Sequence, residues 1–155
     1  MPLTSITIEN YRSVRDLTLP VEQLSLFIGA NGVGKTNLYK ALALLQAAAH
    51  GTLTRAIAEE GGIESVLWAG PRRSGKPVRL VLKAHFDEMA YGLEAGLPHS
   101  YEIEVGLPQP VEAAFKTEPL VKQERLIMRH GRRDVTMMER KGPLVTLRNE
   151  NGERE

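Results

Sequence analysis

The 155-residue sequence predicts an α/β fold with one main helix and a strand-rich, antiparallel remainder. Three observations support this prediction. A glycine-rich segment at 29–36 follows a short apolar run and precedes apolar residues at helical spacing. From residue 78 onward, short alternating segments are separated by glycine and proline. The chain is 42% hydrophobic, which is enough to build the core of one domain.

The first predicted elements are strands. Residues 3–9 alternate apolar and polar side chains, and residues 16–19 can pair with them across a turn at 10–15. Residues 24–28 are Leu-Ser-Leu-Phe-Ile, a short apolar run that predicts a buried strand.

Residues 29–36 read Gly-Ala-Asn-Gly-Val-Gly-Lys-Thr and match the phosphate-binding pattern G-x-x-x-x-G-K-[ST]. The glycines let the backbone wrap around an anion, so that successive N–H groups point at phosphates. Lys35 adds a positive charge, and the hydroxyl of Thr36 is placed to bind Mg²⁺. The sequence therefore predicts a strand, a phosphate loop and a helix that together bind a nucleoside triphosphate.

The helix after this loop is predicted to end near residues 50–51, because Leu38, Ala41, Leu42 and Leu45 recur at helical spacing up to there. A shorter helix is expected at 53–60, and a loop at 89–100. The remaining segments predict strands at 78–86, 101–107, 113–122, 124–130, 135–140 and 143–149.

A second glycine-rich match, Gly70 to Lys76, is rejected as a phosphate site. Pro77 stands where the metal-binding Ser or Thr is needed, and a strand follows instead of a helix. We expect a basic surface turn there.

Composition narrows the class of protein. The net charge of +1 gives no overall attraction to nucleic acid, and the absence of cysteine excludes disulfides and thiolate metal sites. The N-terminus lacks the pattern of a signal peptide, and the longest nearly apolar stretch, 41–49, is too short to cross a bilayer. We expect a cytoplasmic protein without membrane contact.

Hydrolysis also needs a carboxylate on a buried strand near Mg²⁺. Asp87 and Glu88 are the candidates, because they follow an apolar strand. Lys83 and His85 interrupt that strand, however, so it reads as half-solvated, whereas a metal-binding strand is covered on both faces. The pair is more easily explained as a turn at the end of a strand.

Near its end the sequence carries the hairpin-turn dipeptide Asn151-Gly152, with little chain after it for a returning strand. We expect the chain to be the N-terminal piece of a larger protein, the alternative being a frayed natural tail.

Two segments together carry a family resemblance. Ile6 to Val14 reads ITIENYRSV, and Gly29 to Leu38 reads GANGVGKTNL. This combination resembles the RecF/SMC-type ABC ATPases, and more narrowly the predicted AAA-family ATPases of bacteria that are close to the overcoming-lysogenization-defect group. Residues 1–70 carry the resemblance, and residues 71–155 match only in being strand-rich.

The resemblance implies an ABC-ATPase-like head split into two lobes. Residues 1–155 would form a single N-terminal lobe with an antiparallel β-subdomain and the phosphate loop. Its Walker B carboxylates, signature motif and switch histidine would come later in the chain. Such heads form head-to-head homodimers that enclose ATP and Mg²⁺, and they often act on DNA or on a DNA-associated protein.

The resemblance also implies roles for particular residues. The nucleotide-binding loop would comprise Gly29, Ala30, Asn31, Gly32, Val33, Gly34, Lys35, Thr36 and Asn37, with Thr36 as the metal ligand. Arg12 and Ser13 match a turn beside the nucleotide and would contact phosphate or ribose, although Arg12 can also be a surface residue of a tight turn. Gln123 is a candidate for the glutamine that positions magnesium and water.

Two other classes of function remain open. One is a compact P-loop NTPase or kinase that uses Asp87 and Glu88, which requires a parallel strand at 80–86 beside 24–28. The other is a nucleotide-sensing module without turnover. Residues 129–133 are basic and could meet DNA, but a solvated turn is the favoured interpretation. Trp68 is interpreted as a packing residue, and the four histidines lack the spacing of metal ligands.

Overall fold

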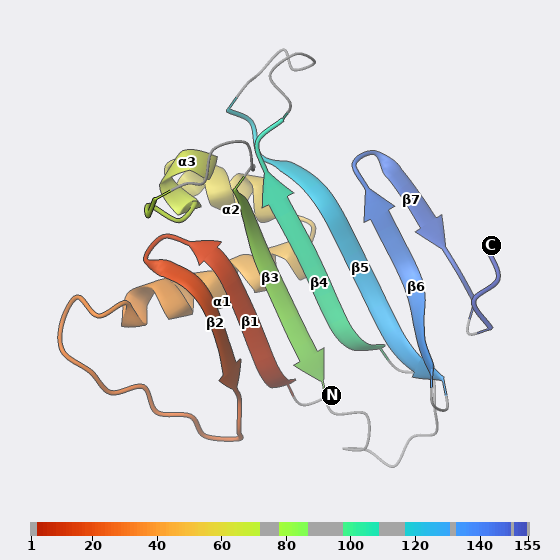
Figure 1. The fold of residues 1–155 in the computed structure, drawn as a ribbon, viewed down its shortest axis with the longest axis horizontal. Coiled ribbons are helices and arrows are strands. Elements are labelled where there is room, and N and C mark those ends of the chain that lie inside the picture. The colour runs from red at the N-terminus through yellow and green to blue at the C-terminus, as the bar shows by residue number, and fades with distance from the viewer. Residues whose placement is uncertain are drawn as a thin grey trace.

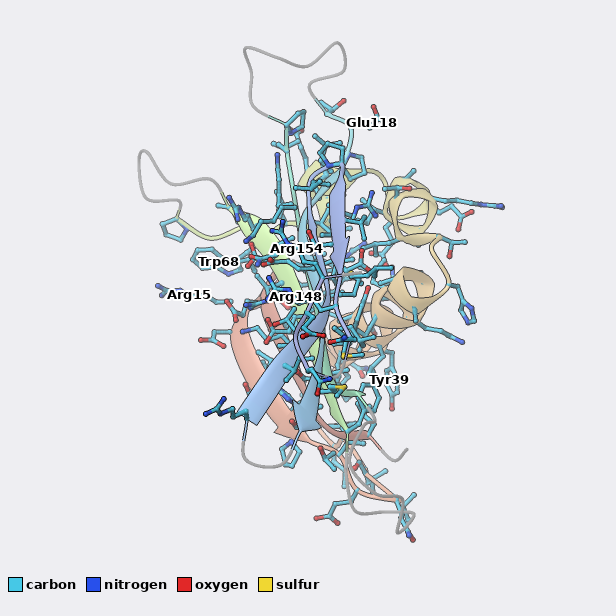
Figure 2. The ribbon with its side chains drawn as sticks, turned by 90° about the vertical axis from the view of Figure 1, so that its right-hand side faces the viewer. Arg15, Tyr39, Trp68, Glu118, Arg148 and Arg154 are labelled. Carbon is cyan, nitrogen blue, oxygen red and sulfur yellow. The ribbon has the colours of Figure 1, made fainter. Side chains whose placement is uncertain are left out.

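The computed structural model describes residues 3–71, 78–86, 98–108, 117–130, 133–149 and 151–154. Within these residues, one antiparallel sheet has the strand order β2-β1-β3-β4-β5-β6-β7. Helices α1 and α2 lie on one face of the sheet (Figure 1). Figure 2 shows the sheet edge-on, with its opposite face free of helices.

The element bounds follow the chain order. The strands are β1 Leu3–Tyr11, β2 Val14–Pro20, β3 Arg79–Phe86, β4 Pro98–Gly106, β5 Leu120–His130, β6 Arg133–Lys141 and β7 Leu144–Leu147. The helices are α1 Lys35–Ala49, α2 Leu53–Glu59 and α3 Ile63–Val66.

The core lies between the helices and the first four strands of the sheet. Alternate residues of β1 and β3 point to the helices and are buried, while their neighbours face the opposite side. The largest fully buried side chains are Tyr11, Ile8, Leu44, Ile57, Ile63, Leu80, Leu82, Met128, Val66 and Val105. Burial of this apolar surface is the main force that joins α1, α2 and α3 to the sheet.

Charged residues pair across strands on the helix-free face. Lys83 Nζ lies 3.4 Å from Glu9 Oε1, and Arg79 Nη1 lies 2.8 Å from Glu104 Oε2. Arg125 pairs with Glu102 on the same face. The prediction of a half-solvated strand at 78–86 is therefore confirmed, because β3 buries one face and carries Lys83 and His85 on the other.

Most predicted elements are present with shifted bounds. The strands predicted at 3–9 and 16–19 pair as β1 and β2, but the turn contains only residues 12 and 13. The two predicted helices correspond to α1 and α2, whereas α3 was not predicted. Asn151 and Gly152 form a turn, with a bridge between Arg148 and Arg154.

Two strand boundaries were wrong. Residues 120–130 form one strand, β5, and not two strands separated at residue 123. The polar residues around 123 face charged neighbours on β4 and β6, so they do not mark a turn. Residues 98–100 belong to β4 although they were assigned to a loop, while the rest of that loop, up to residue 97, lies outside the described residues.

The prediction of a buried strand at 24–28 was also wrong. These residues have no strand assignment, and Leu24, Leu26 and Ile28 are 88%, 78% and 86% exposed. A strand needs hydrogen-bonding neighbours, and within the described residues none lies alongside this segment. Of this apolar run only Phe27 packs against the core, while the described part of the chain leaves Leu24, Leu26 and Ile28 exposed.

Within the described residues, no helix is long and apolar enough to cross a membrane.

Candidate functional site

The glycine-rich segment leads directly into α1. Gly34 is the N-cap residue of the helix and has φ 105°, and Gly32 has φ 86°. A side chain at Gly34 would also be crowded, because a Cβ built there lies 3.3 Å from Ser13 Oγ. The backbone conformation and the close approach of the β1–β2 turn both favour glycine at this position.

The start of α1 has the properties of an anion site. Within the described residues, no side chain caps this helix and its first turn holds no acidic residue. The amides of a first helical turn lack carbonyl partners inside the helix, and the helix dipole adds positive potential there. A cavity of about 240 Å³ opens here and is lined by Asn31, Gly32, Gly34, Lys35, Thr36 and Asn37.

Lys35 bends back over the loop that precedes it. Its Nζ donates hydrogen bonds to the carbonyl oxygen of Ala30 at 2.7 Å and to that of Gly29. Lys35 also lines the cavity, and among the described residues the acceptors of its ammonium group are neutral carbonyls. A phosphate oxygen would be a stronger acceptor than either carbonyl, because the hydrogen bond would then join two opposite charges.

The β1–β2 turn contacts the loop through Ser13. Asn37 Nδ2 donates a hydrogen bond to Ser13 Oγ at 2.8 Å. The structure thus brings Ser13 next to Gly34 and Asn37, which lie far from it in the sequence. Arg12 lies in the same turn, but its side chain pairs with a residue that was not predicted.

That residue is Glu60, directly after α2. Its carboxylate accepts hydrogen bonds from the hydroxyl of Tyr11 at 2.8 Å and from Nε of Arg12 at 3.1 Å. The side chains of Arg12 and Glu60 are 26% and 14% exposed. Burial, together with the hydrogen bond to Glu60, raises the pKa of Tyr11. No sequence pattern marks Glu60 beyond its position before Gly61-Gly62, so only the fold reveals this cluster.

Large apolar side chains before, within and after the glycine-rich loop are exposed. Leu24, Leu26 and Ile28 precede the loop, and Val33 and Tyr39 within and after it are 63% and 60% exposed. Tyr39 projects from α1 in Figure 2. Exposed apolar patches of this kind mark surfaces that bind another protein segment or a ligand.

The structure does not bring the other candidates to the loop. Gln123 lies on β5, three strands from β1, and its Nε2 donates to Glu139 Oε1 at 3.3 Å. At the usual strand spacing this is about 14 Å across the sheet. Asp87 and Glu88 lie outside the described residues. Among the residues that the structure describes, no group of three or more His, Cys, Asp or Glu could hold a metal.

The weaker candidates are placed as follows. Trp68 is half-buried on the helix-free face, with the Arg15 guanidinium 5.3 Å from its ring centroid (Figure 2). A Cβ added to Gly70 would lie 2.0 Å from the indole of Trp68, so the ring packs directly on that glycine. Of the basic segment 129–133, residues 131 and 132 lie outside the described residues, and so do residues 72–77 of the rejected second motif.

Comparison with known proteins gives one family. The family model described as AAA ATPase domain matches residues 1–97, which include the β1–β2 turn, the glycine-rich loop and helices α1, α2 and α3. A search of curated proteins found no match.

Proposed function

The chain belongs to the AAA ATPase domain family, and from this premise we propose that residues 29–37 bind Mg-ATP. The family assigns the chain to proteins that bind and hydrolyse ATP. One observation carries the location of the site: an uncapped helix start, Lys35 and two left-handed glycines line the same cavity. This arrangement offers backbone amides and a positive charge to an anion.

The residues of the loop would have distinct tasks. Gly29, Ala30, Asn31, Gly32, Val33 and Gly34 would supply the backbone that surrounds the phosphates. Lys35 would exchange its carbonyl partners for phosphate oxygens, and Thr36, which is exposed beside it, would bind Mg²⁺ through its hydroxyl. Asn37 is held by Ser13 and would keep the β1–β2 turn against the loop.

We further propose that the chain is the N-terminal lobe of a RecF/SMC-like head. The exposed side chains of Leu24, Leu26 and Ile28 support this, because a second lobe would supply the strands that pair with 24–28. No carboxylate of the described residues lines the cavity, which supports a catalytic group supplied from elsewhere. Head-to-head dimerisation and action on DNA or a partner protein would follow in the complete ATPase.

The compact NTPase alternative is less well supported. It required a parallel strand at 80–86 beside residues 24–28, whereas β3 is antiparallel to its neighbours β1 and β4. A sensing module without turnover remains a second candidate, favoured by the same lack of a carboxylate in the cavity lining. Hydrolysis measurements separate the compact NTPase from the other two, and the sensing module further predicts that ATP binding alters self-association without turnover.

The test is Mg-ATP turnover by the 155-residue chain beside Lys35→Ala and Glu88→Gln. The split-head proposal predicts that the chain binds Mg-ATP but shows no turnover above the Lys35→Ala background. Turnover that Glu88→Gln abolishes would instead establish the compact NTPase. A chain that neither binds nor hydrolyses Mg-ATP would contradict the proposed site.

A further inference from the structure

Arg12 occupies a backbone position that favours glycine. Tyr11 pairs with Val14, so residues 12 and 13 alone form the turn, and Arg12 has φ 46°. A non-glycine residue in this region is strained, because its Cβ lies too close to the following carbonyl oxygen. Glycine would avoid that strain, so the strain indicates that the arginine side chain itself has a use.

The two residues of the β1–β2 turn contact different parts of the molecule. Ser13 faces the phosphate loop and accepts the hydrogen bond from Asn37 on α1. Arg12 instead contacts α3 and Glu60. Its backbone N–H donates to the carbonyl of Val66 in α3 at 2.9 Å, and its guanidinium pairs with Glu60. In Figure 1 the β1–β2 turn lies between the start of α1 and α3. Arg12 is therefore held by α3 and by Glu60, the residue directly after α2.

We propose that Glu60 is a positioning residue that competes with nucleotide phosphates for Arg12. Without nucleotide, the carboxylate holds the guanidinium. When Mg-ATP occupies the loop, its phosphates offer the same planar guanidinium a second anionic partner, and Arg12 exchanges Glu60 for a phosphate oxygen. Glu60 then keeps its hydrogen bond from Tyr11. This inference rests on the proposed function of the loop.

The exchange would set how tightly the site binds ATP. The Arg12–Glu60 pair must be broken before Arg12 can reach a phosphate, so the strength of the pair subtracts from nucleotide affinity. The same exchange would report the presence of nucleotide to α2 and α3, because Glu60 joins the turn to the end of α2.

The experiment measures Mg-ATP affinity by isothermal titration calorimetry on the 155-residue chain. Glu60→Gln removes the charge but keeps a hydrogen-bond acceptor for Tyr11, so we expect Mg-ATP to bind about fivefold more tightly. Glu59→Gln is the matched control, because Glu59 is its sequence neighbour and pairs only with exposed Arg55. It should leave affinity unchanged.

Repeating the Glu60→Gln measurement in a chain that carries Arg12→Ala isolates the role of Arg12. Alanine at position 12 has the same left-handed backbone strain but no guanidinium, so Arg12→Ala should weaken Mg-ATP binding. In that background Glu60→Gln should have no further effect. Unchanged or weaker binding by Glu60→Gln alone, or equal tightening in the Arg12→Ala background, would overturn the proposal.

A measurement on the unmodified chain protects the test against misfolded variants. The Nε–H signal of Arg12 in an NMR spectrum should shift when Mg-ATP is added and should stay unchanged when Mg²⁺ alone is added. Failure of the proposed function gives a different result. In that case the unmodified chain does not bind Mg-ATP at all, whereas failure of this inference leaves Lys35-dependent binding that Glu60 does not affect.

Discussion

The β1–β2 turn and the segment 22–34 both adjoin the start of α1, but they are held in opposite ways. Residues 10–13 are tied to α3, Trp68, Glu60 and Asn37 through backbone and side-chain hydrogen bonds. In residues 24–28, Leu24, Leu26 and Ile28 expose their side chains, and Phe27 alone packs against the core. The β1–β2 turn beside the candidate site is thus fixed by contacts within the described part of the chain, whereas Leu24, Leu26 and Ile28 are left exposed by it.

The largest expected effect is a difference in the free energy of unfolding between a substitution in the core and one in the exposed segment 24–28. Leu44 is 1% exposed and Leu26 is 78% exposed. Leu44→Ala should lower the free energy of unfolding by about 2–5 kcal/mol, because it leaves a cavity in the core. Leu26→Ala should change it by less than about 0.5 kcal/mol. Urea unfolding of both variants measures this difference, and similar losses would mean that residues 24–28 are packed.

The next largest expected effect is the loss of Mg-ATP affinity when Lys35 is replaced. Lys35→Ala should weaken Mg-ATP binding roughly 30- to 100-fold, because it removes a charge-assisted contact to the phosphates. Lys40→Ala, one turn further along α1, is the control and should bind Mg-ATP as the unmodified chain does. Calorimetry checks both variants. Equal affinities for the Lys35→Ala and Lys40→Ala chains would contradict the phosphate-binding role of Lys35.

Alkaline pH should lower the free energy of unfolding through two tyrosines, Tyr11 and Tyr101. Burial, and then hydrogen bonds to Glu60 and Glu124, raise the pKa of Tyr11 and of Tyr101. The folded protein therefore keeps these protons where the unfolded chain loses them. Their contribution to stability is complete below pH 10, the ordinary tyrosine value, and falls above it. The expected slope is up to about 1.4 kcal/mol per pH unit for each tyrosine.

The chain with both Tyr11→Phe and Tyr101→Phe isolates this effect. Unfolding by urea at a series of pH values should show a shallower decline above pH 10 for this variant. The same decline in both chains would assign the pH dependence to other groups.

The smallest effect concerns the hydroxyl of Tyr11. Tyr11→Phe should lower the free energy of unfolding by about 1–2 kcal/mol, because it removes a hydrogen bond to a carboxylate. Tyr39→Phe should cost much less, since Tyr39 is 60% exposed. Thermal melts of the two variants at neutral pH test this pair, and equal costs would show that Tyr11 contributes by packing alone.

The sequence predicted what local patterns determine. The alternation of Ile6 and Ile8, the helical spacing after Gly34, and the interruption of β3 by Lys83 and His85 each follow from side-chain periodicity. The run 24–28 was misassigned because an apolar pattern predicts a strand only where neighbouring strands pair with it, and no strand of the described residues does so. Within the run, Phe27 packs against the core, while Leu24, Leu26 and Ile28 are exposed.

The candidate site was predicted only in part for a related reason. The loop residues are contiguous, so a motif finds them. Ser13 was identified through family resemblance, and its contact with Asn37 joins residues 24 positions apart. Glu60 lies 48 positions from Arg12 and carries no motif of its own, so only the packing of α2 against the turn reveals the pair.

Hydrogen–deuterium exchange with and without Mg-ATP tests the central claim most directly. Binding should slow exchange strongly in peptides that cover residues 29–37, and leave most of β1 unchanged because it is already paired on both sides. Lys35→Ala should abolish the protection. If exchange at 29–37 is the same with and without Mg-ATP, while the nucleotide protects another region, the phosphate loop is not the ATP site of this chain.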